Sequence, residues 1–385
     1  MIYLDYNAST PIDLRVLDAM WPFFASRHGN ASSTDHATGA QARRAVETAR
    51  GQVAELIGAD EEEIVFTSGA TEADNIAILG TLARLGSVAQ ILVSPVEHPA
   101  VLEPARTAGS RLRMTPVDRD GIVDLDALRG LLSAPTGLVA VMAANNETGA
   151  VQPLSEITRL CHEAEVPLHI DAAQAVARIP MDVRTDPCAT LALSGHKMYG
   201  PQGIGALYVR RRRPRARVSP ILFGGGHERN LRPGTLNVPG IVGIGEAARL
   251  VRREREKDAE RESQLRVRLL ERLSEAPVPL HQNLTDAPRL PHTVSMRFEG
   301  VRAAAVMLQL SSEVAISTGS ACSTTSVEPS HVLLAQGLSH DAIKETMRVS
   351  FGRSTSTEDI DTAAELIVGA VEAVVAVASA SQPTQ

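Results

Sequence analysis

The chain has 385 residues, of which 44% are hydrophobic and 22% are charged, and its formal net charge is −7 at pH 7. Because one hydrophobic core rarely serves so long a chain, we expect two domains. The acidic balance argues against wholesale binding to nucleic acid, and no uncharged apolar run approaches the roughly 18 residues that a membrane-spanning helix needs.

Short apolar segments alternate with helical patterns from about residue 40 to 210. Helices are predicted between the strands, for example in 71–85 and 154–165. This alternation is typical of crossover units in a mostly parallel sheet, with ligand chemistry at the carboxyl ends of the strands. The predicted strands lie in EIVFTS (63–68), QILVSP (90–95), GLVAVMAA (137–144), PLHIDAA (167–173), ATLALSG (189–195) and GALYVRR (205–211).

A charged segment, residues 249–275, follows and is predicted to form an exposed helix that links two domains. Its apolar positions include Leu250, Leu265 and Val267. We divide the chain into a large domain, 15–255, and a small α/β domain made of 1–14 and 256–385. The strands expected in the small domain are HTVSMRF (292–298), AVMLQL (305–310) and TMRVSFG (346–352).

Three cysteines are too far apart and too few for a disulfide framework, and no CxxC pair indicates zinc. Cys161, on a helical apolar face, and Cys188, before a buried strand, are expected to be small core residues. Cys322 differs, because AISTGSACSTTSVE surrounds it with small and polar residues, as suits a thiol that must reach a partner.

The opening MIYLDYNAST lacks the features of a secretory signal, so we expect a cytoplasmic protein.

The basic run RRRRPRAR (210–217) permits two interpretations. The first is a solvated loop that follows a strand. The second is a docking surface for an acidic partner or nucleic acid, although no aromatic residue is interleaved to support it.

Lysine is rare in this chain, with only Lys197, Lys257 and Lys344. The last two lie among charged residues in predicted helices. Lys197, in LALSGHKMYGPQGIG, follows an apolar strand at a Ser-Gly-His turn, where a lysine with little competing charge can form an imine. The carbonyl compound that this predicts is pyridoxal phosphate.

Pyridoxal phosphate needs an anion site, a carboxylate for its ring nitrogen and a group against its ring. The start of the helix in EIVFTSGATEADNIAI, with the Thr71 hydroxyl, offers the anion site. Asp171 ends an apolar strand, where an unpaired carboxylate is costly and a protonated ring nitrogen would offset that cost. Gln174 is placed to bond the phenolic oxygen of the ring, and His98 is a candidate for stacking and proton transfer.

These segments, in this order, resemble cysteine desulfurases of the class V aminotransferase family, which are fold type I pyridoxal phosphate enzymes. The resemblance implies an α/β fold, in which a large domain holds a mostly parallel seven-stranded sheet and a smaller domain carries the catalytic cysteine loop. It extends from about residue 3 to 354, and SGHKMYGPQGIG with GGGHER is its most specific part. The matching stretches are YLDYNASTP, FTSGATEADN, EHPAVLE, NNETG, HIDAAQ, SGHKMYGPQGIGALYVRR, GGGHERNLRPGTLNV, GSACST, EPSHVL and RVSFGR.

The resemblance also implies a role for individual residues, and no metal among their ligands. Lys197 would form the Schiff base and His98 would stack on the cofactor. Asn146 and Arg353 would bind the substrate, Arg353 through the carboxylate, and Thr235 would reach the phosphate of a neighbouring subunit in a homodimer. The remaining contacts implied are Ala70, Thr71, Ser194 and His196 at the phosphate, and Asn146, Asp171 and Gln174 at the ring.

The implied reaction removes sulfur from L-cysteine and leaves L-alanine. Lys197 would take the Cα proton, and the Cys322 thiolate would attack the sulfur and carry it as a persulfide to an acceptor protein. The long loop around Cys322 is similar to that of the iron–sulfur-cluster and nitrogen-fixation subgroup. Iron–sulfur assembly, tRNA thiolation and DNA phosphorothioation stay open as pathways, because the chain ends in AVASASQPTQ and not in the longer extension typical of housekeeping members. Pro233 stands where the family has serine, and it stiffens the turn beside Thr235 and cannot donate a backbone hydrogen bond there.

Two other classes of function remain as alternatives. One is another class V enzyme, such as a selenocysteine lyase or an aminotransferase, although an aminotransferase has no use for the Cys322 loop. The other is a catalytically silent paralogue that serves as a scaffold, although such a protein would be expected to have lost Lys197, Asp171 or Cys322.

Overall fold

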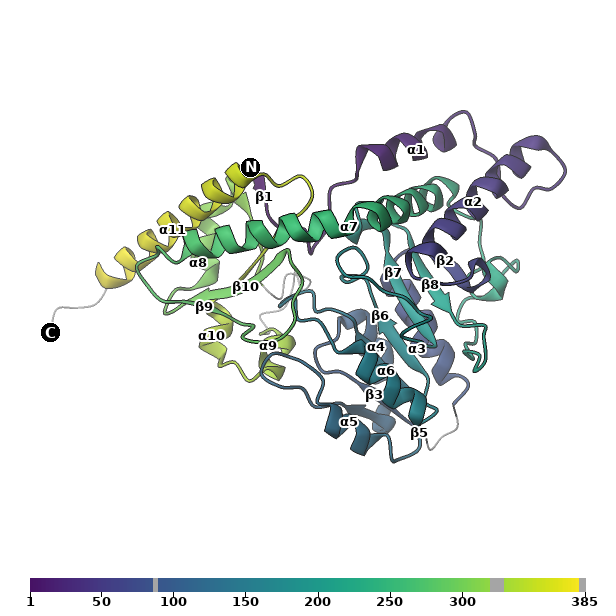
Figure 1. Ribbon diagram of the computed structural model, residues 1–385, viewed down its shortest axis with the longest axis horizontal. Coiled ribbons are helices and arrows are strands. Elements are labelled where there is room, and N and C mark those ends of the chain that lie inside the picture. Colours follow the sequence, from purple (N-terminus) through teal and green to yellow (C-terminus); the bar gives the residue numbers. More distant parts are fainter. Residues whose placement is uncertain (86–88, 319–328, 381–385) are drawn as a thin grey trace.

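The computed structural model describes residues 1–85, 89–318 and 329–380. Figure 1 shows a larger part of the molecule around the main sheet and a smaller part around a second sheet. One long helix, α7 (Val238–Leu273), runs along both parts.

The main sheet has seven strands in the order β2-β8-β7-β6-β5-β3-β4. Strand β8 is antiparallel to both of its neighbours, and the remaining neighbouring pairs are parallel. The predicted mostly parallel sheet is therefore confirmed. The strands are β2 (Ile64–Thr67), β3 (Gln90–Val93), β4 (Leu112–Met114), β5 (Thr136–Met142), β6 (Leu168–Asp171), β7 (Thr190–Ser194) and β8 (Gly205–Val209).

Helices cover the main sheet, so the central strands are buried along their length, as their continuous apolar runs predict. Helix α3 packs across β6, β7 and β8, and α1 and α2 pack against α7. The helices of this part are α1 (Leu14–Phe24), α2 (Ala37–Leu56), α3 (Ala70–Leu82), α4 (Pro99–Arg106), α5 (Leu125–Leu131) and α6 (Leu154–Glu163).

The smaller part contains an antiparallel sheet in which β10 (Thr293–Phe298) lies between β9 (Leu280–Gln282) and β12 (Thr346–Ser350). The chain's first strand, β1 (Ile2–Tyr3), pairs in parallel with β11 (Val314–Ala315), which joins the N-terminus to this part. Its helices are α8 (Ala303–Leu310), α9 (His331–Ala335), α10 (His340–Glu345) and α11 (Thr357–Ala380).

One predicted strand is wrong. The segment AVMLQL (305–310) lies inside helix α8. A short apolar run does not by itself distinguish a strand from a buried helix. The buried residues Ala303, Val306 and Leu310 recur at helical intervals, and the alanines at the start of the run favour helix.

Helix α7 confirms the predicted charged helix and begins earlier than expected, at Val238. Leu250 belongs to the apolar core of the larger part, and Leu265 to that of the smaller part. Val267 does not serve either core, because it is 50% exposed. The helix is continuous through residue 255, and the domain boundary placed there stays a prediction.

The basic run 210–217 lies beside the acidic turn Glu61–Glu63. Arg211 is 2.7 Å from a carboxylate oxygen of Glu62, and Arg212 is 2.7 Å from one of Asp60. These ion pairs offset part of the positive charge, which favours the interpretation as a solvated loop.

Cys161 and Cys188 are free and buried, as predicted for core residues. Burial raises the pKa of each thiol to about 12, so both stay protonated at neutral pH. Within residues 1–85, 89–318 and 329–380, no helix combines the length and hydropathy required to cross a membrane.

Candidate active site

A cavity of about 480 Å³ opens where the parallel strands of the main sheet end. Met142, Asp171 and Ser194, the last residues of β5, β6 and β7, all line it, as the carboxyl-end rule predicts. The predicted site residues that line the cavity are Ala70, Thr71, His98, Asn146, Asp171, Gln174, Ser194, His196 and Lys197.

Lys197 ends a short 3₁₀ turn, Gly195–Lys197, that follows β7 directly. Its ε-amine donates to the carbonyl oxygen of Ala8 at 2.7 Å and also to that of Asn7. The N-terminal segment therefore passes beside the lysine and orients its amine within the cavity.

Asp171 is buried at the end of β6, and burial raises the pKa of its carboxyl. The backbone N–H of Ala173 donates to its Oδ1 at 2.9 Å. Two more buried carboxyls, Asp74 and Glu97, lie nearby. Burial raises the pKa of both, and the charge of Asp171 acts in the same direction. A cationic group against Asp171 would offset the cost of this buried charge, which fits a protonated pyridine nitrogen.

The expected phosphate site lies at the start of helix α3. The N-cap of this helix is Gly69, which has no side chain to accept from the first N–H groups. A Cβ on Gly205 would lie 2.6 Å from the Cα of Gly69, so the two backbones are in close contact here. Thr71, in the first turn of this helix, and Ser194 both line the cavity, and these groups fit a phosphate.

The two histidines of the cavity are held neutral. Burial lowers the pKa of His196 to about 4, and the charge of Lys197 acts in the same direction. Burial also lowers the pKa of His98. The Nδ1 atom of His98 accepts from the backbone N–H of Ala100 at 3.1 Å, so the proton of the neutral ring is on Nε2.

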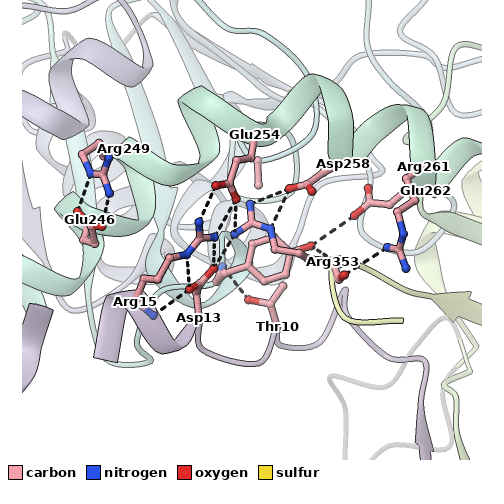
Figure 2. A network of polar contacts seen from close by, with 12 residues as sticks. Thr10, Asp13, Arg15, Glu246, Arg249, Glu254, Asp258, Arg261, Glu262 and Arg353 are labelled. Atoms are coloured by element: carbon pink, nitrogen blue, oxygen red, sulfur yellow. Dashed lines mark hydrogen bonds and ion pairs between the residues drawn. The ribbon is translucent and has the colours of Figure 1, made fainter. Parts of the chain in front are cut away.

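The structure does not bring Arg353 to the cavity, so the expected contact with a substrate carboxylate is not supported. Its guanidinium is 2.8 Å from Asp13 and 2.7 Å from Asp258, within the ion-pair network of Figure 2. Arg353 does not reach the cavity because it follows the end of β12, where the chain turns toward helix α7.

Arg348 lines the cavity instead, a position that was not predicted from the sequence. It lies within β12, donates to Asp5 at 2.6 Å and donates to the carbonyl oxygen of Asn146 at 2.8 Å. The signal in the sequence was an arginine inside the apolar strand TMRVSF, since a buried arginine requires a partner. Asn7 is a second lining residue that the prediction missed.

The remaining predicted residues lie outside the cavity or outside the described chain. Thr235 is exposed and does not line the cavity. Cys322 falls in 319–328, outside the described residues.

A model of the class-V aminotransferase family matches residues 2–362. The chain belongs to this family. It is 46% identical over 371 residues to the cysteine desulfurase IscS of Anaeromyxobacter sp. (strain Fw109-5), which covers 95% of this chain and 91% of that protein. A solved NifS-like protein is similar with a TM-score of 0.89 and 32% identity, over 97% of this chain and 99% of that one. SspA in complex with cysteine is similar with a TM-score of 0.79 and 34% identity, over 91% and 99%.

These class-V relatives confirm the predicted family, the fold type I architecture and the assignment as a cysteine desulfurase. Pyridoxal phosphate is the cofactor of this family, and the cavity fits it on two independent observations. The buried carboxyl of Asp171 suits a ring cation, and the N-terminus of α3, capped by a glycine, suits a phosphate.

Proposed function

We propose that this cysteine desulfurase takes the sulfur of L-cysteine onto Cys322, with Lys197 as the base and Arg348 as the carboxylate-binding group. The observation that carries the proposal is the convergence of Lys197, Asp171 and Arg348 on one cavity at the carboxyl ends of the strands. A structural neighbour solved in complex with cysteine supports this amino acid as the substrate.

The cavity residues would hold the cofactor at three points. Lys197 would bind it covalently, and Asp171 would pair with its protonated ring nitrogen. Thr71, Ser194 and the first N–H groups of helix α3 would bind its phosphate. When bound, pyridoxal phosphate supplies an electron sink for the negative charge that develops at the substrate Cα.

Arg348 would orient the substrate by its carboxylate. A guanidinium can donate two parallel hydrogen bonds to a carboxylate, which fixes the direction of the amino acid as well as its position. The carbonyl oxygen of Asn146 and the carboxylate of Asp5 hold the guanidinium at the cavity wall. Arg348 thereby replaces Arg353 in the role that the sequence analysis assigned to the latter.

The side chains of Lys197 and Cys322 would carry out the proton and sulfur transfers. The Lys197 amine would take the Cα proton, oriented by the carbonyl oxygens of Asn7 and Ala8. The Sγ of Cys322 would form a bond to the substrate sulfur as the Cβ–S bond breaks. The electron pair of that bond stays with Cβ, which takes up a proton, and the carbon skeleton leaves as alanine.

A homodimer and a separate acceptor protein are part of the proposal. Thr235 is exposed, and Phe223, in the segment just before it, is 87% exposed. Trp21 of helix α1 is 66% exposed. Large apolar side chains at a surface are typical of an interface, which supports a second subunit.

A cytoplasmic location is also proposed, because the described cysteines Cys161 and Cys188 are unpaired.

The test of the proposed function is the release of alanine and sulfide from L-cysteine in the presence of a thiol reductant. We expect the parent to release both products and Lys197→Ala to release neither. Lys257→Ala is the matched control, because Lys257 is exposed on helix α7. A parent that turns over selenocysteine and leaves cysteine intact would instead favour a selenocysteine lyase.

A further inference from the structure

We propose that Arg353 is a positioning residue, which acts through Tyr199 to fix the turn that carries Lys197 relative to the strand that carries Arg348. The inference rests on the proposed function of those two residues. Arg353 itself lies outside the cavity, so it is not a catalytic residue.

Tyr199 is the link between Arg353 and the Lys197 turn. It follows Lys197 by two residues, is buried and has a φ of +63°, which a residue with a bulky side chain rarely adopts. The surrounding contacts must therefore stabilise this backbone conformation. The backbone N–H of Arg353 donates to the Tyr199 hydroxyl at 3.0 Å, and Arg178 donates to the same oxygen at 2.9 Å.

Two guanidinium groups also lie over the aromatic ring of Tyr199. That of Arg353 is 4.4 Å from the ring centroid, and that of Arg178 is 5.1 Å away. Both distances are within the range of cation–π attraction. The Tyr199 hydroxyl donates in turn to Glu262 of helix α7 at 3.3 Å, so the ring is held at its face and at its edge.

The guanidinium of Arg353 spans two separate elements. It donates to Asp258 of helix α7 at 2.7 Å and to Asp13, before helix α1, at 2.8 Å (Figure 2). Glu254 lies 3.4 Å away on the same helix. A planar guanidinium can bond in two directions and stack on a ring at once, whereas a lysine ammonium offers only a point charge.

The N-terminal segment 5–13 connects this network to the active site. At one end Asp5 pairs with Arg348, and at the other end Asp13 pairs with Arg353. Between these ends, the Ala8 carbonyl accepts from Lys197. At Asp13 itself, the backbone N–H donates to the Tyr199 carbonyl at 3.0 Å. The segment is thus bound to both arginines and to the Lys197 turn.

A shift of this turn would move the Lys197 amine relative to a substrate held by Arg348. A misplacement of about 1 Å in a reacting group can reduce the rate by roughly 100-fold. A Cβ on Gly352 would lie 2.7 Å from the Tyr199 hydroxyl, so the backbone before Arg353 is already in close contact with this ring. We therefore expect loss of the Arg353 side-chain contacts to change the position of the Tyr199 ring before that of any other residue in the Lys197 turn.

The test compares the holoenzyme of Arg353→Gln, Arg353→Lys and Tyr199→Phe with a matched control, Arg268→Gln. Arg268 is also on helix α7 and makes a bidentate ion pair at 2.6 Å, but its partner is Asp361 and not a member of the Arg353 network. The readouts are kcat and KM for L-cysteine and, without cysteine, the pH midpoint of the visible absorption band of the bound cofactor. That midpoint reports on the surroundings of Lys197.

We expect Arg353→Gln to lower kcat by about 10- to 100-fold with little change in KM, since Arg348 still binds the carboxylate. The pH midpoint should shift by about half a unit or more, which a purely structural role would not produce. Arg353→Lys should give an intermediate kcat, and Arg268→Gln should match the parent in both readouts.

The inference is overturned if Arg353→Gln and Tyr199→Phe both match Arg268→Gln in kcat and in the pH midpoint. Should Arg353→Gln fail to fold, Tyr199→Phe decides alone, because it removes only the hydroxyl that joins the network. A parent that forms no alanine would refute the proposed function, whereas the pH midpoint would still test the positioning of Lys197.

Discussion

Arg348 donates to the carboxylate of Asp5 at 2.6 Å, at the wall of the cavity that Lys197 enters. The side chain of Arg348 is 3% exposed and that of Asp5 is 19% exposed, so water screens this pair only weakly. In the proposed role of Arg348, a substrate carboxylate would share the guanidinium with Asp5. The arginine is thus held in place before substrate arrives, which lowers the entropic cost of binding.

Arg348→Gln should reduce kcat/KM for L-cysteine by about 100-fold or more, mainly through a higher KM, because a charge-assisted hydrogen bond is lost. The binding of pyridoxal phosphate should be retained. Arg297→Gln is the control, since Arg297 lies on the adjacent strand β10 and pairs with Glu345 outside the cavity. Equal steady-state constants for the two variants would refute the role of Arg348.

Asp171→Asn should lower the affinity for pyridoxal phosphate and reduce alanine formation by about 100-fold or more, because an amide does not stabilise a protonated ring nitrogen. Cofactor titration of the purified variant measures the first effect and an alanine assay the second. Asp126→Asn, on the surface of helix α5, should behave like the parent. Unchanged cofactor binding in Asp171→Asn would contradict the assigned pairing.

Glu147→Gln should make stability less dependent on pH. Burial raises the pKa of Glu147 to about 7, so the folded state keeps a proton that the unfolded state releases. The stability that this provides is complete below the unfolded pKa and is lost as the pH rises through 7. From pH 5 to pH 8, the unfolding free energy of the parent should fall by roughly 2–3 kcal/mol more than that of the variant.

Urea denaturation of the holoenzyme at the two pH values measures this difference. Glu103→Gln is a suitable control, because Glu103 is exposed and should leave the pH dependence of the parent intact. A parent and a Glu147→Gln variant with parallel pH profiles would show that Glu147 is ionised in the folded state throughout this range.

Gly205→Ala should destabilise the fold by about 1–3 kcal/mol and weaken the binding of pyridoxal phosphate, because the added methyl forces backbones apart. That methyl would lie 2.6 Å from the Cα of Gly69, beside the proposed phosphate site. Gly130→Ala places a methyl in open space on helix α5 and should be neutral or stabilising. Thermal unfolding with and without added cofactor distinguishes the two variants. Equal unfolding temperatures, and equal stabilisation by the cofactor, would refute the predicted steric clash at Gly205.

The sequence was most informative where a residue type was both rare and locally unusual. Lys197 follows an apolar strand and Asp171 ends one, and the crossover pattern places such positions at one edge of the sheet. Local pattern was insufficient for AVMLQL, where five apolar residues fit either a strand or the helix α8 that the structure contains.

The choice between Arg348 and Arg353 required tertiary structure. Both belong to RVSFGR, and only the course of the chain after β12 turns Arg353 toward helix α7. The contacts of segment 5–13 were likewise beyond prediction, since they join residues separated by more than 180 positions, such as Ala8 and Lys197.

The central claim is that Cys322 receives the sulfur that Lys197 helps to release. The most direct measurement is the intact mass of the protein after incubation with L-cysteine and without reductant, alongside the alanine formed. We expect the parent to gain the mass of sulfur with alanine in matching amount, and Cys322→Ser and Lys197→Ala to gain none. Sulfur that appears on Cys322→Ser as on the parent, or alanine formed by that variant at the parental rate, would contradict the account.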